Sequence, residues 1–178
     1  MSSFFEKLSS ITTFIFDVDG VLTDGIVHVT ENGDQLRQFN IKDGYALKLA
    51  IKRGFLVAVI SGATSKSTEF RLRALGVKDI FLGVDSKIHV YQDFVQANQL
   101  SAEQILYMGD DIPDFPVMKL AGLATCPADA VEEIKAISHY ISPRNGGKAC
   151  ARDVIEKTLK AQNKWYNANP SAYDGRLM

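Results

Sequence analysis

Cysteine is scarce in this sequence, and the two that occur, Cys126 and Cys150, do not form a Cys-x-x-Cys pair. A chain of 178 residues that is 46% hydrophobic can bury one sizeable core without a disulfide. We therefore expect free thiols in a reducing compartment. We also expect a single domain at residues 1–162, followed by an irregular C-terminal tail at 163–178.

The sequence also lacks a surplus of basic residues and any long apolar run. Lys and Arg number 20 against 21 Asp and Glu, which gives a formal net charge of −1. Because binding to nucleic-acid phosphates needs a basic surface, no nucleic acid is expected as a partner. No stretch reaches the roughly 18 apolar residues that span a bilayer, and residues 1–13 lack a signal-like apolar segment. We expect a cytoplasmic protein that does not bind membranes.

Four short apolar runs, each followed by turn or polar residues, predict buried strands at 13–16, 56–60, 80–82 and 105–108. Continuous rather than alternating apolar strands are buried on both faces, as in a parallel sheet covered by helices. Helices are predicted between and after them, at Tyr45–Arg53, Lys66–Leu75, Ile88–Gln99, Ala130–Ile137 and Ala149–Ala161. This alternation predicts a Rossmann-like open parallel α/β sheet with helices on both faces.

One segment interrupts the alternation of strands and helices. Asn32-Gly33 lies between two strand-like runs, which predicts a β-hairpin at about 26–39. The hairpin contains more apolar side chains than a solvent-exposed hairpin requires. Exposed apolar strands of this kind are usually paired with another strand or covered by other parts of a protein. These side chains are Ile26, Val27, Val29, Leu36 and Phe39.

Polar residues able to do chemistry follow each of the four predicted strands. Ligands of open α/β sheets bind beyond the carboxyl ends of the strands, so these side chains should converge. Converging carboxylates repel unless a cation neutralises them, and hard oxygen ligands favour Mg²⁺ over Zn²⁺. A lysine and a hydroxyl supply charge and a hydrogen-bond donor for phosphoryl oxygens. The candidates are Asp17, Asp19, Ser61, Lys87, Asp110, Asp111 and Asp114.

Each of these signals taken alone has a simpler explanation. Asp17 to Gly20 and Gly109 to Asp111 could be acidic turns, Ser61 could cap a helix, and Lys87 could be a surface lysine. Their order and their placement at strand ends favour catalysis instead. The three histidines, which are scattered without metal-ligand spacing, are assigned no chemistry: His28, His89 and His139.

The same residues resemble the four ordered motifs of the haloacid dehalogenase superfamily. The motifs are Asp17-Val18-Asp19-Gly20, Ser61-Gly62, Lys87 and Gly109-Asp110-Asp111-Ile112-Pro113-Asp114. The resemblance implies a phosphatase with Asp17 as nucleophile, an aspartyl-phosphate intermediate, and Asp19 as general acid/base. It implies that Ser61, Gly62 and Lys87 hold the phosphoryl group. It also implies Mg²⁺ ligands from Asp17, the Asp19 main-chain carbonyl and Asp110, supported by Asp111 or Asp114.

A finer resemblance, over about residues 11–159, is to a subfamily that removes phosphate from 3-deoxy-D-manno-octulosonate 8-phosphate in lipopolysaccharide sugar biosynthesis. It implies Arg71 and Arg144 as further substrate-binding residues. The subfamily commonly has Ser-Gly-Arg at the second motif, whereas this chain has Ala63. A nine-carbon ulosonate 9-phosphate, of the KDN or sialic-acid type, therefore remains an alternative substrate. A non-catalytic module of this fold would lack at least one of Asp17, Asp19, Lys87 and Asp110, and all four are present.

The spacing of the motifs leaves no room for a cap domain. Asp17 and Ser61 are 44 positions apart and Ser61 and Lys87 are 26 apart, and the predicted hairpin, helices and strand fill both intervals. An uncapped site must exclude water in another way, and a neighbouring subunit is the simplest lid. The resemblance implies a homotetramer in which the hairpins pack together.

Overall fold

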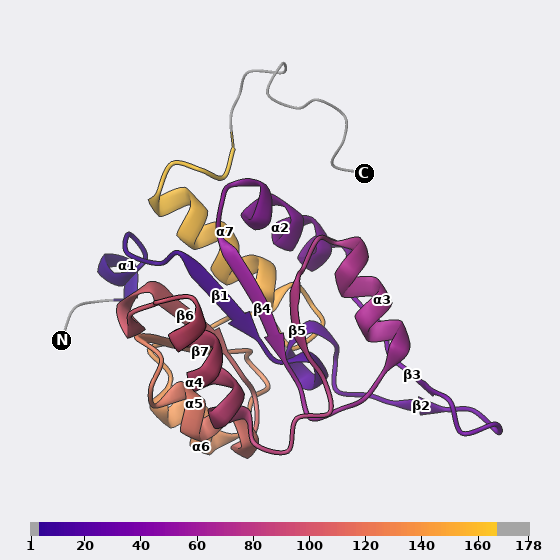
Figure 1. The fold of residues 1–178 in the computed structure, drawn as a ribbon. Coiled ribbons are helices and arrows are strands. Elements are labelled where there is room, and N and C mark those ends of the chain that lie inside the picture. Colours follow the sequence, from indigo (N-terminus) through magenta and orange to yellow (C-terminus); the bar gives the residue numbers. More distant parts are fainter. Residues whose placement is uncertain (1–3, 167–178) are drawn as a thin grey trace.

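The computed structural model describes residues 4–166, which form an open six-stranded sheet with helices on both faces (Figure 1). The strand order is β5-β4-β1-β6-β7-β8, and every neighbouring pair is parallel. The strands are β1 Thr13–Phe16, β4 Leu56–Ile60, β5 Asp79–Phe81, β6 Ile105–Met108, β7 Leu123–Cys126 and β8 Tyr140–Ile141. The predicted fold class is confirmed, although β5 begins and ends one residue earlier than expected.

Seven α-helices are assigned in the described part of the chain. They are α1 Phe4–Lys7, α2 Ile41–Lys52, α3 Lys66–Ala74, α4 Lys87–Ala97, α5 Phe115–Met118, α6 Glu132–Ile137 and α7 Cys150–Ala161. The predicted start of α2 at Tyr45 was wrong, because Asn40 caps the helix and accepts a hydrogen bond from Lys42 N at 2.9 Å. None of the helices described is long and apolar enough to cross a membrane.

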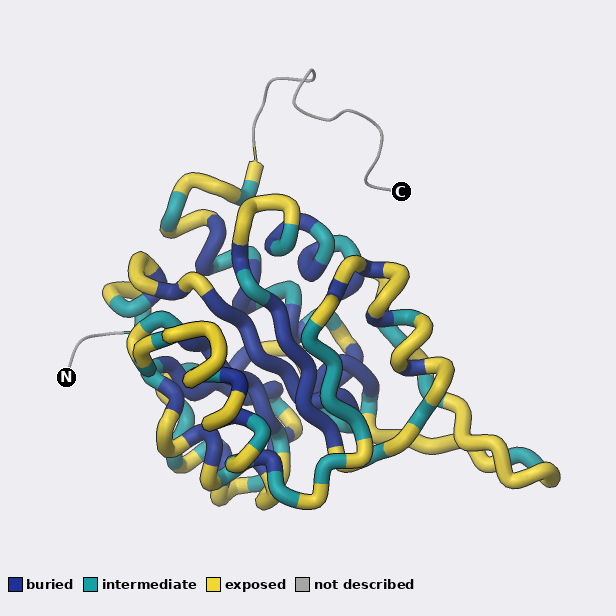
Figure 2. The backbone as a smooth tube through the Cα atoms, in the orientation of Figure 1, coloured by how far each residue is buried: buried dark blue, intermediate teal, exposed yellow. Residues whose placement is uncertain are grey.

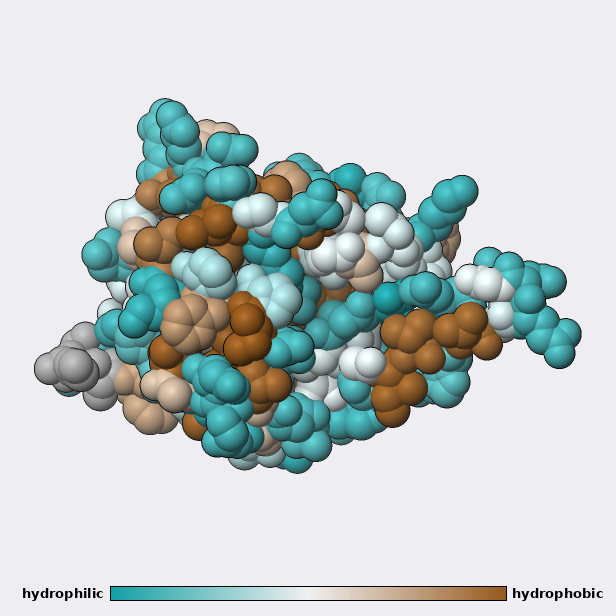
Figure 3. Space-filling view, turned by 90° about the horizontal axis from the view of Figure 1, so that it is seen from below, coloured by the Kyte–Doolittle hydropathy of each residue, from teal (hydrophilic) through white to brown (hydrophobic). Residues whose placement is uncertain are grey.

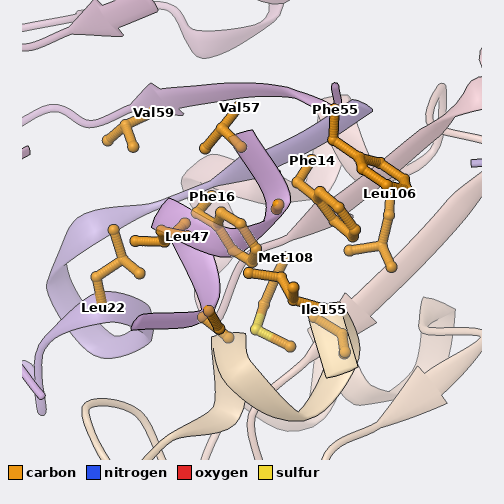
Figure 4. Packing of buried hydrophobic residues seen from close by; sticks show 14 of the residues in the cluster. Phe14, Phe16, Leu22, Leu47, Phe55, Val57, Val59, Leu106, Met108 and Ile155 are labelled. Carbon is orange, nitrogen blue, oxygen red and sulfur yellow. The ribbon is translucent and has the colours of Figure 1, made fainter. Parts of the chain in front are cut away.

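The strands separate two apolar cores because successive side chains point to opposite faces. Phe14 and Phe16 of β1 pack with α2, α3 and α7, whereas Ile15 packs with α4, α5 and α6. Figure 4 shows the first core, in which Leu47 of α2 and Ile155 of α7 approach the strand side chains. Burial of the central strands on both faces (Figure 2) explains their continuous apolar sequences.

The predicted hairpin is present and projects from the body of the molecule (Figures 1 and 2). Its strands β2 His28–Val29 and β3 Gln35–Leu36 are antiparallel, and the paired part is shorter than 26–39. Val29 is 68% exposed and Leu36 51%, and Figure 3 shows apolar side chains gathered along this arm. Phe39 was wrongly grouped with them, because it packs against the first core.

The end of the chain is ordered further than its composition suggests. Trp165, which was assigned to the irregular tail, packs edge-on against Tyr45 with ring centroids 6.1 Å apart. The guanidinium of Arg152 lies 5.2 Å from the Trp165 ring centroid. The rest of the predicted tail, residues 167–178, lies outside the described residues.

Asp43 on α2 caps the N-terminus of α7, although the two elements are far apart in sequence. Its Oδ1 accepts a hydrogen bond from Arg152 N at 2.7 Å, while the N-cap residue of α7, Ala149, offers no side-chain acceptor. Asp43 is only 2% exposed, and this burial raises the pKa of its carboxyl group to about 6 against the opposing hydrogen bonds from Arg152 and Ala149.

Asp43 should make stability depend on pH between about 4 and 6. Since the folded-state pKa lies above the ordinary 3.8, ionisation of Asp43 costs stability as pH rises through this window. Asp43→Asn keeps an acceptor without the charge, so its free energy of unfolding should rise relative to wild type by on the order of 2 kcal/mol between pH 4 and 7. Urea unfolding at each pH measures the difference. Asp43→Ala, which loses the cap, should cost about 1 kcal/mol even at pH 4. If the difference in the free energy of unfolding between Asp43→Asn and wild type did not change with pH, this role of Asp43 would be contradicted.

Candidate active site

The predicted catalytic residues converge at the carboxyl edge of the sheet, where they line one cavity of about 760 Å³. Asp17 follows β1, Ser61 follows β4, Asp110 lies just beyond β6, and Lys87 begins α4. The size falls within the range of about 300–1,000 Å³ that is usual for small-molecule sites. The lining residues include Asp17, Asp19, Gly20, Ser61, Gly62, Ala63, Lys87, Asp110, Asp111 and Asp114.

Lys87 lies between two buried carboxylates. Its Nζ is 3.0 Å from Asp17 Oδ1 and donates a hydrogen bond to Asp114 Oδ1 at 2.7 Å. Burial favours the neutral amine, but the charges of Asp17 and Asp114 outweigh it and raise the pKa of Lys87 above its ordinary value. Lys87 is therefore an ammonium group that faces the cavity.

Asp114 acts as an organiser of the site, because other groups of the protein already use its oxygens. Oδ1 accepts hydrogen bonds from Lys87 and from Tyr107 Oη, the latter at 2.6 Å. Oδ2 accepts from the main-chain N of Asp110 at 3.1 Å. Asp111, by contrast, is exposed, and its side chain accepts from Ile112 N at 2.7 Å. Of the two supporting candidates, Asp114 is the one built into the centre.

Three carboxylates crowd this centre and have one ammonium group to balance them. Oxygens of Asp17, Asp110 and Asp114 lie within 4.8 Å of one another. Burial raises the pKa of Asp17 to about 7, with a further contribution from Asp114 and opposition from Lys87. Burial, Asp17 and Asp114 raise the pKa of Asp110 to about 8, and its buried Oδ1 has no hydrogen-bond partner among residues 4–166. The excess negative charge and the unused oxygen suit a divalent cation with oxygen ligands.

The loop after β1 lets the carboxylate of Asp110 approach the main chain closely. Gly20 has φ +86°, and a Cβ built on it would lie 2.0 Å from Asp110 Oδ2. The Gly146-Gly147 pair makes the opposite face of this loop: a Cβ at Gly146 would lie 1.9 Å from the Gly20 carbonyl oxygen. Gly147 N donates to Val21 O at 2.9 Å. Because these glycines have no side chain, the Asp110 carboxylate and the Gly146 backbone can both lie against Gly20, three residues after Asp17.

Asp19 lines the cavity with a side chain that is 31% exposed, and it is held by a residue that the sequence analysis missed. Arg37, just after β3, donates from Nε to Asp19 Oδ1 at 2.6 Å and from Nη2 to Asp19 Oδ2 at 3.1 Å. Thr23 Oγ1 lies 3.4 Å from the same Oδ1. No local signal in the sequence pointed to this residue, because Arg37 lies 18 positions from Asp19 and its approach depends on the hairpin.

Ser61 and Gly62 line the same cavity, directly after the carboxyl end of β4. Ser61 is 2% exposed, its main-chain N donates to Phe81 O at 2.9 Å, and its Oγ accepts from Ala63 N at 3.3 Å. The strand pairing of β4 with β5 thus fixes this hydroxyl where β4 ends.

Arg71 and Arg144 do not line this cavity. Arg71 on α3 lies against α2, where a Cβ built on Gly44 would be 2.8 Å from its Nη2. Arg144 lines a separate cavity of about 530 Å³ with Asn40 and Lys148. A substrate contact from either arginine stays a prediction.

Comparisons with known proteins agree with this geometry. A family profile described as haloacid dehalogenase-like hydrolase matches residues 77–152. The 3-deoxy-D-manno-octulosonate 8-phosphate phosphatase of Yersinia pestis is 35% identical over 159 residues, which is 89% of this chain and 85% of the relative. The Escherichia coli K12 phosphatase of the same name is 35% identical over 158 residues, 89% of this chain and 84% of the relative.

Solved structures of similar proteins have the same fold. The Yersinia pestis phosphatase superimposes with a TM-score of 0.88 at 34% identity, over 90% of this chain and 87% of that one. The Moraxella catarrhalis phosphatase, in complex with magnesium ion, phosphate ion and KDO, gives a TM-score of 0.89 at 29% identity over 98% of each chain. A cobalt-bound form from Haemophilus influenzae gives 0.87 at 34% identity, over 93% of this chain and 97% of that one.

Proposed function

This chain belongs to the haloacid dehalogenase-like hydrolases and, within them, to the 3-deoxy-D-manno-octulosonate 8-phosphate phosphatases, and we propose that it hydrolyses that phosphate monoester in lipopolysaccharide sugar biosynthesis. The observation that carries the proposal is the placement of Asp17, 3.0 Å from the ammonium of Lys87, in a cavity that also contains Asp19 and Asp110.

In the proposed reaction Asp17 attacks phosphorus, and the bond between phosphorus and the sugar oxygen breaks. Asp19 gives its proton to that leaving oxygen, which yields the free sugar acid and an aspartyl-phosphate. Water then attacks phosphorus, Asp19 takes the water proton, and the Asp17 carboxylate is restored as phosphate leaves. Lys87 and the Ser61 hydroxyl hold the phosphoryl oxygens during both steps.

The acidic centre fits Mg²⁺, the ion present in the Moraxella structure. We infer that Asp17, the Asp19 main-chain carbonyl and Asp110 hold it, while Asp114 keeps Lys87 in place. Bound Mg²⁺ neutralises charge and orients the phosphate for attack. The free Oδ1 of Asp110 supports this assignment, since Asp114 has both oxygens occupied by the protein.

The eight-carbon substrate is favoured over the nine-carbon alternative. The relatives at 35% identity carry the name of the octulosonate phosphatase, and the Moraxella structure contains KDO. Ala63 lines the cavity where the subfamily commonly has arginine, so the contact that this arginine would make must come from another residue.

Phosphate release from a panel of substrates tests the proposal. The panel comprises the octulosonate 8-phosphate, a nine-carbon ulosonate 9-phosphate and ordinary hexose phosphates, each assayed at equal concentration with Mg²⁺. The highest kcat/KM is expected for the octulosonate 8-phosphate. Asp17→Asn protein prepared in parallel reports any contaminating phosphatase. Equal activity across the panel would contradict the substrate assignment but leave the reaction class intact.

We further propose that the active unit is a homotetramer in the cytoplasm. The projecting hairpin supports the assembly, because Ile26, Val29 and Leu36 are each more than half exposed. Residues 4–166 form no cap domain over the cavity, so a neighbouring subunit that covered it would exclude water from the reaction. The cytoplasmic location is supported by the two cysteines, which are free and buried.

Val29→Asp should dissociate the assembly and lower activity together. The substitution places a charge on the exposed face of β2, where a contact between copies would have to desolvate it. Sedimentation at the assay concentration, run beside kinetics, measures both effects. Leu120→Asp is the matched control, because Leu120 is also an exposed apolar residue but lies after α5. A fully active monomer of the unaltered chain would exclude the assembly as part of the site.

A further inference from the structure

We propose that Arg37 is a positioning residue for the general acid/base Asp19, and that it links the hairpin to proton transfer at the leaving group. This inference rests on the proposed phosphatase function. It concerns a residue outside the four motifs and outside the three carboxylates of the acidic centre.

Arg37 is almost completely buried, which is unusual for a charged residue at the stem of an exposed hairpin. Its side chain is 3% exposed, whereas Gln35 and Leu36 of β3 are exposed. The guanidinium makes a bidentate ion pair with Asp19, with 2.6 and 3.1 Å between the paired atoms. A fork of this kind fixes the plane of the carboxylate, which a single contact would leave free to rotate.

The surroundings explain why Asp19 needs such a fixed partner. The cavity holds Asp17, Asp110 and Asp114 close together, and the ammonium of Lys87 is already shared between Asp17 and Asp114. An unpaired Asp19 carboxylate would be repelled by these charges and drawn toward water at the cavity mouth. The positive charge of Arg37 opposes this displacement.

The two oxygens of Asp19 are held unequally, and this assigns their roles. Oδ1 has the shorter contact with Arg37 and also lies 3.4 Å from Thr23 Oγ1. Oδ2 has only the 3.1 Å contact with Nη2. We assign Oδ2 as the oxygen that exchanges the proton, because it can leave Nη2 while Oδ1 remains anchored.

Arg37 also keeps one donor unused. Its Nη1 is buried and has no hydrogen-bond partner within the described range 4–166. Methionine at this position would remove all five N–H donors of the guanidinium, whereas lysine would keep the positive charge but not the planar fork.

A comparison of two leaving groups tests the role of Arg37 through Asp19. The sugar alkoxide needs a proton to leave, whereas 4-nitrophenolate leaves without one. Arg37→Met should therefore lower kcat/KM for octulosonate 8-phosphate by about 10²-fold, the usual contribution of a general acid. For 4-nitrophenyl phosphate the loss of kcat/KM should be less than about threefold, because kcat/KM covers the steps up to the aspartyl-phosphate and not the later attack of water, in which Asp19 acts as a base for both substrates. Arg37→Lys should recover part of the loss.

Further measurements separate positioning from a general structural role. In the Asp19→Asn background, Arg37→Met should cause no further loss of kcat/KM on the sugar phosphate. The Mg²⁺ concentration for half activity should not change. Arg73→Met, at an exposed arginine on α3, is the matched control. Equal losses of kcat/KM on both substrates, an unchanged kcat/KM, or full additivity with Asp19→Asn would each overturn the inference. Absence of phosphate release by the unaltered enzyme would instead overturn the proposed function.

Discussion

Asp17→Asn is expected to lower phosphate release by at least about 10⁴-fold, because the amide cannot act as the nucleophile that forms the aspartyl-phosphate. The substitution is nearly isosteric at a residue that is only 6% exposed, so the packing around β1 should be retained. Steady-state kinetics with the best substrate of the panel measures the loss. Rapid acid quenching with a ³²P-labelled substrate should detect phosphorylated wild-type enzyme and none in the variant.

The same substitution should not lower thermal stability in the absence of Mg²⁺. Burial raises the pKa of Asp17 to about 7, so at pH 8 the metal-free protein maintains an unfavourably placed charge. Removing that charge offsets the loss of one partner of Lys87, which keeps Asp114. The midpoint of unfolding at pH 8 is expected to equal or exceed that of wild type. Asp93→Asn, at an exposed position on α4, is the control. Substantial remaining activity in Asp17→Asn would refute the covalent mechanism.

Removal of Mg²⁺ with a chelator is expected to lower activity by roughly 10³-fold or more, because the ion supplies several kcal/mol of charge stabilisation in such reactions. Mg²⁺ should restore activity, and Ca²⁺ should restore little, since Ca²⁺ does not enforce octahedral geometry. Mg²⁺ should also raise the midpoint of thermal unfolding by mass action, which gives a readout independent of turnover.

Asp110→Ala separates the metal site from the rest of the cavity. Loss of a ligand should raise the Mg²⁺ concentration for half activity by at least about 10²-fold. Loss of a residue that only hydrogen-bonds to a metal ligand already lowers metal affinity by about 10–100-fold. It should also abolish the thermal shift caused by Mg²⁺. Asp93→Ala is expected to leave both quantities unchanged. A variant with the wild-type requirement for Mg²⁺ would show that Asp110 is not a ligand.

The sequence predicted those parts of the fold that have a strong local signal. The strands β1, β4, β5 and β6 are largely apolar and are followed within two residues by glycine or an acidic residue, so their type and order could be inferred. β7 and β8 were missed. Leu123-Ala124-Thr125-Cys126 contains only one β-branched residue, and Tyr140–Ile141 is two residues long. Both become strands because the edge of β6 and then of β7 is available for pairing, which is a tertiary effect.

Within the site, the sequence identified groups at strand ends more readily than their partners. Ordered motifs located Asp17, Lys87 and Asp110, because parallel strands bring their carboxyl ends together. Tyr107 was taken for another apolar strand residue, yet its hydroxyl donates to Asp114. Arg37 reaches Asp19 only through the path of the hairpin. The burial of one position and the course of a loop cannot be inferred from local composition.

The close contact between the backbones of Gly20 and Gly146 determines when the enzyme can become active during its synthesis. The loop from Asp17 to Gly20 emerges from the ribosome early, but Gly146, which packs against Gly20, is 126 positions further along the chain than Gly20. Contacts of such large sequence separation form late, after their loop-closure entropy has been paid. A nascent chain that ends before residue 146 therefore contains all four motifs of the site but lacks the Gly146-Gly147 backbone that packs against the loop after β1. Phosphatase activity is expected only once α7 has been translated and has docked.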